Sequence, residues 1–218
     1  MGVPVLALDV DTMPGMAYSI GIPPDQGRLP AGLAQLIEFK NGRRWKMIPG
    51  NGPTRLVDRH AFRGPDGIRF LELGKLPLAV EPSVTVAFRY VLERYRRAGW
   101  AMVGDLAAGT RQPMFRWSRF ADTVVVVADA SQKSLMSARK LSKLATHLVA
   151  NRVRSAEELE RIRSAVDLPL LHSIPYDEAL ARAEQKGLAP MDGAAGSAAV
   201  AAIGELTQRL MKLGRDIQ

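Results

Sequence analysis

Three carboxylates and one amide follow short apolar runs in this sequence. Asp9 and Asp11 end the first apolar run of the chain, Asp105 follows a later run, and Asn151 follows a third. Carboxylates can act on Mg²⁺ and on an attacking water, and an amide that donates and accepts at once can read the edge of a base. Taken one at a time, each residue is equally explained as a helix cap or a turn. Their order along the chain favours a nucleotide site.

The elements that must position these residues alternate along the chain. Strands are predicted at 3–8, 68–73, 100–103, 123–128, 148–153 and 168–173, and helices at 31–39, 82–97, 112–119, 131–144, 156–165, 178–186 and 194–213. The uninterrupted valines of 124–127 indicate a strand covered on both faces. The pattern predicts a three-layer α/β/α fold with a mostly parallel sheet, in which ligands bind beyond the carboxyl ends of the strands.

Two segments depart from this alternation. Residues 40–67 are rich in Gly, Pro and Arg, and we expect turns there. The last helix is amphipathic and is expected to pack on the sheet through its apolar positions, with a membrane-surface role as the alternative. Those positions are Ala198, Ala201, Ala202, Leu206 and Leu210.

Composition excludes several classes of chemistry. The 218 residues contain no Cys and three scattered His, which excludes disulfides, thiolate metal sites and a cysteine nucleophile. No composition break requires a second domain, so residues 1–218 are interpreted as a single domain. Neither a signal peptide nor a membrane span is present in the sequence, and a cytoplasmic location is expected.

The chain is strongly basic. Thirty Lys and Arg against 22 Asp and Glu give a formal charge of +8, which attracts polyanions. The densest basic stretches are 94–97, 111–119 and 133–143. We interpret them as solvated helix faces, with an anion-binding surface as the alternative.

Five motifs in order give the sequence a family resemblance. It resembles the MinD/ParA-type ATPases, the SIMIBI class of P-loop proteins with a deviant Walker A motif. The resembling segments are Val5–Pro14 (second strand and switch I), Asp105–Gly109 (Walker B and switch II), 121–138 (a strand and a Ser-rich helix start), Asn151-Arg152 (base reading) and Ile174–Asp177 with Gly187.

The middle of the chain looks most like the carbon monoxide dehydrogenase maturation (CooC-type) ATPases. The similar residues are 64–68, 73–75 and Asp105 with Ala108-Gly109. That family carries a metal-binding C-x-C after the position of Lys75, where this chain has Pro77-Leu78-Ala79-Val80-Glu81. A thiolate nickel or zinc site is therefore excluded.

The resemblance also predicts a glycine-rich phosphate loop, G-K-G-G-x-G-K-[ST], which this sequence does not contain. We interpret the sequence as N-terminally incomplete, without the first strand, P-loop and first helix, about 30 residues in all. Because that strand lies inside the sheet, two unpaired edges and a tendency to aggregate are expected.

The resemblance implies ATP and Mg²⁺ as ligands, with ATP-bound homodimerisation and an unidentified client protein. Its site residues would be Asp11 (orients the attacking water), Asp9 and Asp105 (Mg²⁺ through its waters), Gly109 (switch II), Asn151 and Arg152 (adenine), and Pro175, Tyr176 and Asp177 (base pocket). Without the phosphate loop, no hydrolysis is expected. The alternatives are a non-catalytic partner-binding scaffold, a basic nucleic-acid-associated protein and a fragment without a function of its own.

Overall fold

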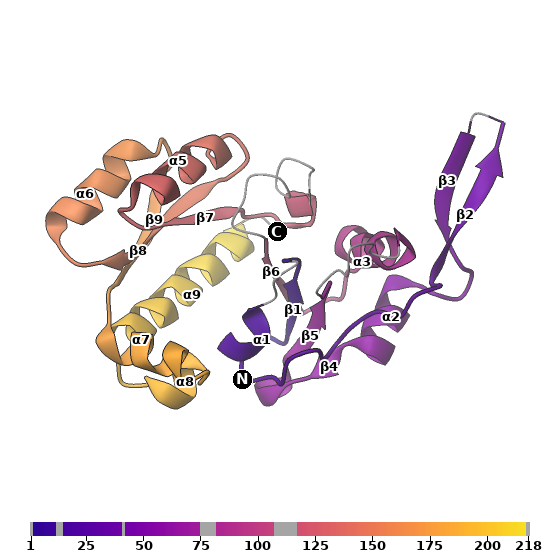
Figure 1. The fold of residues 1–218 in the computed structure, drawn as a ribbon, viewed down its shortest axis with the longest axis horizontal. Helices are drawn as coiled ribbons and strands as arrows, with labels where there is room; N and C mark the ends of the chain where they lie inside the picture. Colours follow the sequence, from indigo (N-terminus) through magenta and orange to yellow (C-terminus); the bar gives the residue numbers. More distant parts are fainter. Residues whose placement is uncertain (1, 12–14, 41, 75–81, 107–116, 217–218) are drawn as a thin grey trace. The chain divides into compact units, whose positions relative to one another are not determined.

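The computed structural model describes residues 2–11, 15–40, 42–74, 82–106 and 117–216. The chain divides into two compact units, residues 1–107 and 108–218 (Figure 1).

The first unit is built on a four-stranded sheet with the order β4-β5-β1-β6. Strands β1 (Val5–Asp9), β5 (Arg69–Glu72) and β6 (Ala101–Asp105) are parallel, and the short β4 (Phe62–Arg63) is antiparallel to β5. Helices α1 (Met16–Ser19), α2 (Pro53–His60) and α3 (Pro82–Arg94) and a 3₁₀ turn at Pro65–Gly67 complete the unit. The expected strands at 3–8 and 68–73 and the helix at 82–97 are confirmed.

Strands β1 and β5 of this sheet are buried on both faces. Ala7 and Phe70 pack with Ala17 and Ile22 of the segment that follows β1. The next residues along the two strands, Leu8 and Leu71, are also fully buried. They point to the other face, because side chains alternate along a strand. These buried strands therefore fix the positions of the residues at their carboxyl ends.

The expected helix at 31–39 is wrong. Residues Ala34–Phe39 form β2, which pairs antiparallel with β3 (Gly42–Met47). A two-residue connection before a glycine favours a hairpin, and a helix of nine residues has little intrinsic stability to compete with it. Residues 40–67 are correspondingly more regular than expected, since they include β3, α2 and β4.

The second unit holds the regular alternation that the sequence predicts. Its parallel sheet has the order β7-β8-β9, formed by Val125–Ala128, His147–Val153 and Leu170–Pro175. The helices are α5 (Gln132–Leu141), α6 (Ala156–Ala165), α7 (Glu178–Gln185), α8 (Pro190–Gly193) and α9 (Ala198–Asp216). The expected helix at 112–119 lies mostly outside the described residues, which show a 3₁₀ turn at Trp117–Phe120.

This second unit has three layers. Leu148 and Ala150 of β8 pack with Leu135 of α5 and Ile162 of α6. Val149, which points to the opposite face, packs with α9, and Figure 1 shows α9 running along that face. The α/β/α layering therefore comes directly from the alternation along β8.

The face that α9 presents to the sheet agrees with the expected one at Ala202 and Leu206 and differs from it at Ala198 and Ala201. Ala199, Ala202 and Leu206 pack there, whereas Ala198 and Ala201 are exposed. The helix begins at Ala198 and not at 194, and its contacting residues follow the i, i+3, i+7 spacing of one helix face from Ala199. None of the helices in the described ranges is long and apolar enough to span a bilayer.

Two of the edge strands in the described sheets carry an exposed valine. They are β6, with Val103 at 53% exposure, and β7, with Val127 at 57%. The expectation that 124–127 is covered on both faces is thus wrong at Val127, although Val126 and Ala128 on the other face are buried.

Candidate functional site

Three carboxylates lie in register across three parallel strands of the first unit. Asp9, the last residue of β1, is paired with Glu72 of β5 on one side and with Asp105 of β6 on the other. Residues in register on parallel strands project from the same face, and all three lie at the carboxyl ends of their strands. The structure therefore brings two expected residues, Asp9 and Asp105, into one acidic row.

Asp9 anchors the segment that follows β1. Its carboxylate is fully buried, and one oxygen (Oδ1) accepts a hydrogen bond from the Asp11 N–H at 3.0 Å. The other oxygen (Oδ2) accepts from the N–H groups of Gly15 and Met16 at 3.1 and 3.0 Å. Asp9 thus positions the backbone of Asp11 and the start of α1, while Thr12 to Pro14 lie outside the described residues.

Asp105 carries the most perturbed carboxyl group of the row. It is a solvent-exposed residue, yet the surrounding protein removes part of the water from its carboxyl group. This desolvation, followed by repulsion from Asp9 and Asp11, raises the pKa of Asp105 to about 6. A bound cation would offset the repulsion, so the row has the electrostatics of a cation-accepting position.

Glu72 is a member of the row that the sequence analysis missed. It is buried, and its Oε1 accepts a hydrogen bond from Arg28 Nε at 2.6 Å, while Arg28 also pairs with Asp25. Burial raises the pKa of Glu72 despite the opposing effect of Arg28. The sequence signal was weak, since Glu72 lies between Leu71 and Leu73 inside the expected strand.

A hollow of about 370 Å³ lies at the carboxyl edge of the sheet in the second unit. Of the expected residues, Arg152 and Tyr176 line it, whereas Asn151, Pro175 and Asp177 are not among its lining residues. The lining residues are Asp129, Ala130, Ser131, Arg152, Arg154, Glu158, Arg161 and Tyr176. The hollow therefore combines three guanidinium groups with two carboxylates and one aromatic ring.

An irregularity in β8 gives Arg152 an unusual backbone conformation. The register between β8 and β9 shifts between Ala150 and Val153, and Arg152 has a positive φ of 56°. The Asn151 side-chain oxygen accepts a hydrogen bond from the Arg152 N–H at 3.0 Å, and the Arg152 guanidinium pairs with Glu184 at 3.3 Å. A left-handed conformation is costly for a non-glycine residue and concentrates at functional positions.

The wall of the hollow is held by two further interactions. The Arg154 guanidinium lies over the Tyr176 ring, 4.1 Å from its centroid. Asp129 accepts a hydrogen bond from the Ser131 N–H at 2.9 Å. Hydrogen bonding by Ser131, with a smaller contribution from the charge of Arg152, lowers the pKa of Asp129. Asp129 is therefore ionised and faces the arginine.

Asp177 has a structural task. Its Oδ1 accepts hydrogen bonds from the N–H groups of Ala179 and Leu180 and caps α7, and its Oδ2 accepts from the Ala199 N–H of α9 at 3.4 Å. The backbone hydrogen bond from Leu180 is the largest of the effects that lower the pKa of Asp177. Pro175 is the last residue of β9, paired with Val153. The expected Gly109 lies outside the described residues.

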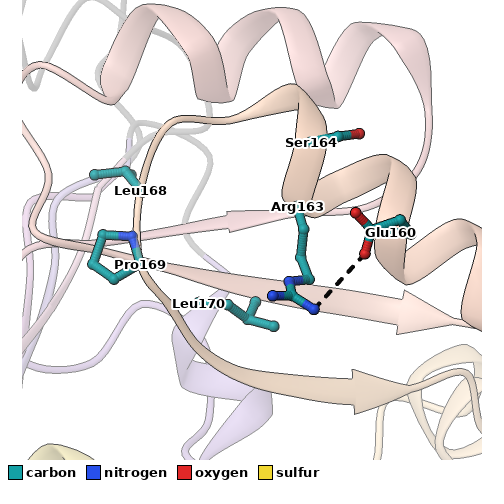
Figure 2. Close-up of a pocket in the computed structure, with 6 residues that line it drawn as sticks. All are labelled: Glu160, Arg163, Ser164, Leu168, Pro169 and Leu170. Atoms are coloured by element: carbon teal, nitrogen blue, oxygen red, sulfur yellow. Dashed lines mark ion pairs between the residues drawn. The ribbon is translucent and has the colours of Figure 1, made fainter.

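A second hollow of about 580 Å³ lies at the opposite end of β9, where α6 ends (Figure 2). Arg163 pairs with Glu160 there at 3.7 Å, and Leu168, Pro169 and Leu170 form the other wall. None of the expected site residues lines it.

The acidic row supplies only part of the ligands that a Mg²⁺ ion needs. Across the described residues, no group of three or more His, Cys, Asp or Glu is placed to hold a metal ion. Mg²⁺ usually keeps several waters and is held by one or two carboxylates together with phosphate oxygens. The donor set fits such a water-mediated position and does not fit a cage made of protein ligands.

Comparison with known proteins identifies the fold. The structure is similar to a ParA family ATPase from Chlorobium tepidum (TM-score 0.67, 18% identity, 95% of this chain and 85% of that one). It is also similar to the septum site-determining protein MinD complexed with Mg-ADP from Pyrococcus horikoshii (TM-score 0.64, 17% identity, 96% and 84%). A third similar structure is the MinC:MinD cell division protein complex from Aquifex aeolicus (TM-score 0.60, 15% identity, 95% and 83%).

One curated relative is an uncharacterized ATP-binding protein from Methanocaldococcus jannaschii, 26% identical over 117 residues, which cover 49% of this chain and 46% of the relative. The chain therefore spans less than half the length of that relative. No protein-family model matches the sequence. These comparisons confirm the predicted three-layer α/β/α fold with a mostly parallel sheet, the fold of the MinD/ParA ATPases.

Proposed function

We propose that this protein is a nucleotide-dependent molecular switch of the MinD/ParA type that takes ATP with Mg²⁺. The observation that carries the proposal is the register of Asp9 with Asp105 at the carboxyl edge of the first sheet. The shared fold and the ATP-binding relative support the same conclusion.

In this proposal three carboxylates have different tasks. When Mg²⁺ is bound, the exposed Asp105 would hold it through its waters, and in a polypeptide that also carries the phosphate loop Asp11 would orient the attacking water. Asp9 acts on both indirectly, because its oxygens already accept three backbone N–H groups. Mg²⁺, when bound, supplies charge that offsets the phosphates.

The second unit contributes base recognition. In this proposal Asn151 would read adenine, and Pro175 and Tyr176 would lie beside the base. Of these residues Tyr176, whose ring is covered by the Arg154 guanidinium, lines the hollow of the second unit. Asp177 supports this loop as the cap of α7. Gly109 belongs to switch II.

The 218-residue polypeptide is proposed to bind nucleotide without hydrolysing it. Its sequence contains no loop of backbone N–H groups and lysines to hold the phosphates. Within the MinD/ParA ATPases the proposal assigns the chain to a CooC-like type without a thiolate metal site, since the sequence has no cysteine. The output is ATP-dependent homodimerisation that controls a client protein.

The test is a titration of a fluorescent ATP analogue with and without Mg²⁺, beside an assay of phosphate release. We expect saturable, Mg²⁺-dependent binding and no release of phosphate. Asp105→Asn should weaken the Mg²⁺-dependent part about tenfold, as loss of one charge-assisted contact does. Glu160→Gln, which removes a carboxylate from the surface near the second hollow, is the matched control and should bind like the parent.

Base recognition is tested separately by competition with GTP and with inorganic tripolyphosphate. Asn151→Ala should reduce the preference for ATP over GTP and leave competition by tripolyphosphate unchanged. Absence of saturable binding of any nucleotide at millimolar concentration would contradict the proposal and favour the partner-binding scaffold.

A further inference from the structure

The β2–β3 hairpin is a feature of the first unit that the proposed function does not use. Figure 1 shows it extending away from α2 and α3 as a two-stranded ribbon. Its base packs against α3, where Ala34 is buried, but every residue described between Gln35 and Lys46 is exposed apart from the half-buried Ile37. Both faces of the ribbon are therefore open to solvent.

The ribbon is strongly basic. Lys40, Arg43, Arg44 and Lys46 stand against the single carboxylate of Glu38. Glu38 pairs with Arg43 at 3.1 Å. Within the described part of the chain, no salt bridge involves Lys40, Arg44 or Lys46, so three positive charges are available to an anionic partner.

Apolar side chains are interleaved with these charges. Leu36 and Trp45 are paired across the strands on one face, and they are 46% and 36% exposed. Phe39 is 43% exposed and lies on the other face, where the Arg44 guanidinium stacks on its ring at 3.5 Å. None of these rings contributes to a core, although large exposed apolar groups on a narrow ribbon promote aggregation.

We propose that the β2–β3 hairpin is a binding arm for single-stranded nucleic acid. Successive bases stack on aromatic rings, and a cationic surface beside the rings follows the phosphates. Trp45 offers an open ring, while Phe39 with Arg44 offers a second stacking plane. The basic residues 133–143 have charge without rings, whereas this ribbon has both.

Single strands are favoured over the other polyanions by the position of the rings. A duplex stacks its base faces inside the helix, so Trp45 and Leu36 would find only groove edges. An anionic bilayer would take apolar residues gathered on one face, whereas here Trp45 and Phe39 lie on opposite faces.

Binding of a labelled 20-nucleotide single strand and of the matching 20-bp duplex is measured by fluorescence anisotropy. Binding to phosphatidylserine vesicles is measured by sedimentation. All assays are run without ATP or Mg²⁺. Binding of the single strand should fall steeply with salt. Trp45→Ala should weaken it about tenfold, and Trp45→Phe should retain affinity but lose the quenching of tryptophan fluorescence.

Charge is tested with a matched pair of triple variants. Lys40→Ala/Arg44→Ala/Lys46→Ala should lower the salt slope by about 2, at roughly 0.7 per phosphate contact. Lys133→Ala/Lys140→Ala/Lys143→Ala removes the same charge from an exposed helix region and should bind like the parent. Far-UV circular dichroism verifies that each variant is folded.

Three results would overturn the inference. They are equal loss of binding in both triple variants, duplex binding as tight as single-strand binding, and vesicle binding that depends on Trp45 without any single-strand binding. Because the assay contains no ATP or Mg²⁺, its outcome is independent of whether the nucleotide switch is correct.

Discussion

Asp9 and Asp105 occupy paired positions on adjacent parallel strands, and their surroundings differ sharply. Asp9 is fully buried and its oxygens accept three backbone N–H groups, whereas Asp105 is open to solvent and accepts none of them. The hydrogen bonds hold the charge of Asp9 in place, and Asp105 experiences its repulsion.

Asp105→Asn should stabilise the protein at neutral pH and not in acid. The pKa of Asp105 is raised from 3.8 to about 6, so the folded state holds its proton more tightly than the unfolded state. The free energy of unfolding therefore falls as pH rises from about 4 to about 6. With allowance for solvent screening at this exposed residue, we expect a gain of about 1 kcal/mol at pH 7.5 and none near pH 4.

Urea denaturation at both pH values measures this difference. Asp122→Asn, at an exposed aspartate of the second unit, is the control and should change neither value. An equal gain for Asp105→Asn at both pH values would show that repulsion within the acidic row is not its cause.

Arg28→Ala should destabilise the protein through the carboxylate that it leaves behind. Glu72 is buried, and its salt bridge with Arg28 is the contact that compensates its charge. Breaking a buried pair costs about 3–5 kcal/mol, and we expect about 2 kcal/mol here because Arg28 is partly exposed. The double variant Arg28→Ala/Glu72→Gln should regain most of the loss in urea denaturation. A double variant as unstable as Arg28→Ala would mean that lost packing of Arg28 causes the effect.

The sequence predicts the second unit well because its signals are local. The expected helix 156–165 matches α6 at both ends. Its start is fixed by a reciprocal cap within residues 154–158, in which Ser155 accepts a hydrogen bond from the Glu158 N–H and Glu158 accepts one from the Arg154 N–H. The strand β8 is predicted by an equally local signal, its run of apolar residues.

The first unit is predicted less well because its decisive contacts are distant in sequence. Glu72 is held by Arg28, 44 positions away, and no local pattern indicates that pair. In the hairpin, Leu36 and Trp45 serve no core, so apolar spacing gave no indication of strands. Asp177 was identified as a site residue from its motif, while its hydrogen bonds are those of a helix cap, and both interpretations require the same residue type.

Gly27→Ala should be far more destabilising than Gly32→Ala. Both glycines have positive φ, 69° and 77°, so a side chain strains the backbone at either position. At Gly27 a Cβ would also lie 2.3 Å from the Phe70 carbonyl oxygen, whereas nothing lies within 4 Å at Gly32. We expect about 1 kcal/mol for Gly32→Ala and at least about 3 kcal/mol for Gly27→Ala, measured as midpoints of urea denaturation. Equal losses would mean that β5 shifts to accommodate the methyl group.

Val103→Lys and Val127→Lys should reduce self-association without loss of stability. Each valine lies on an edge strand of its described sheet and is more than half exposed, so a lysine there meets solvent and repels a second edge. Met136→Lys, which places the same charge at an exposed apolar residue of α5, is the control. Sedimentation velocity over a range of protein concentrations should show less associated material for the two edge variants than for the control. If all three variants behave alike, added net charge is responsible and the sheet edges are not the contact. If the edge variants unfold at lower urea, the valines contribute to packing that their exposure does not reveal.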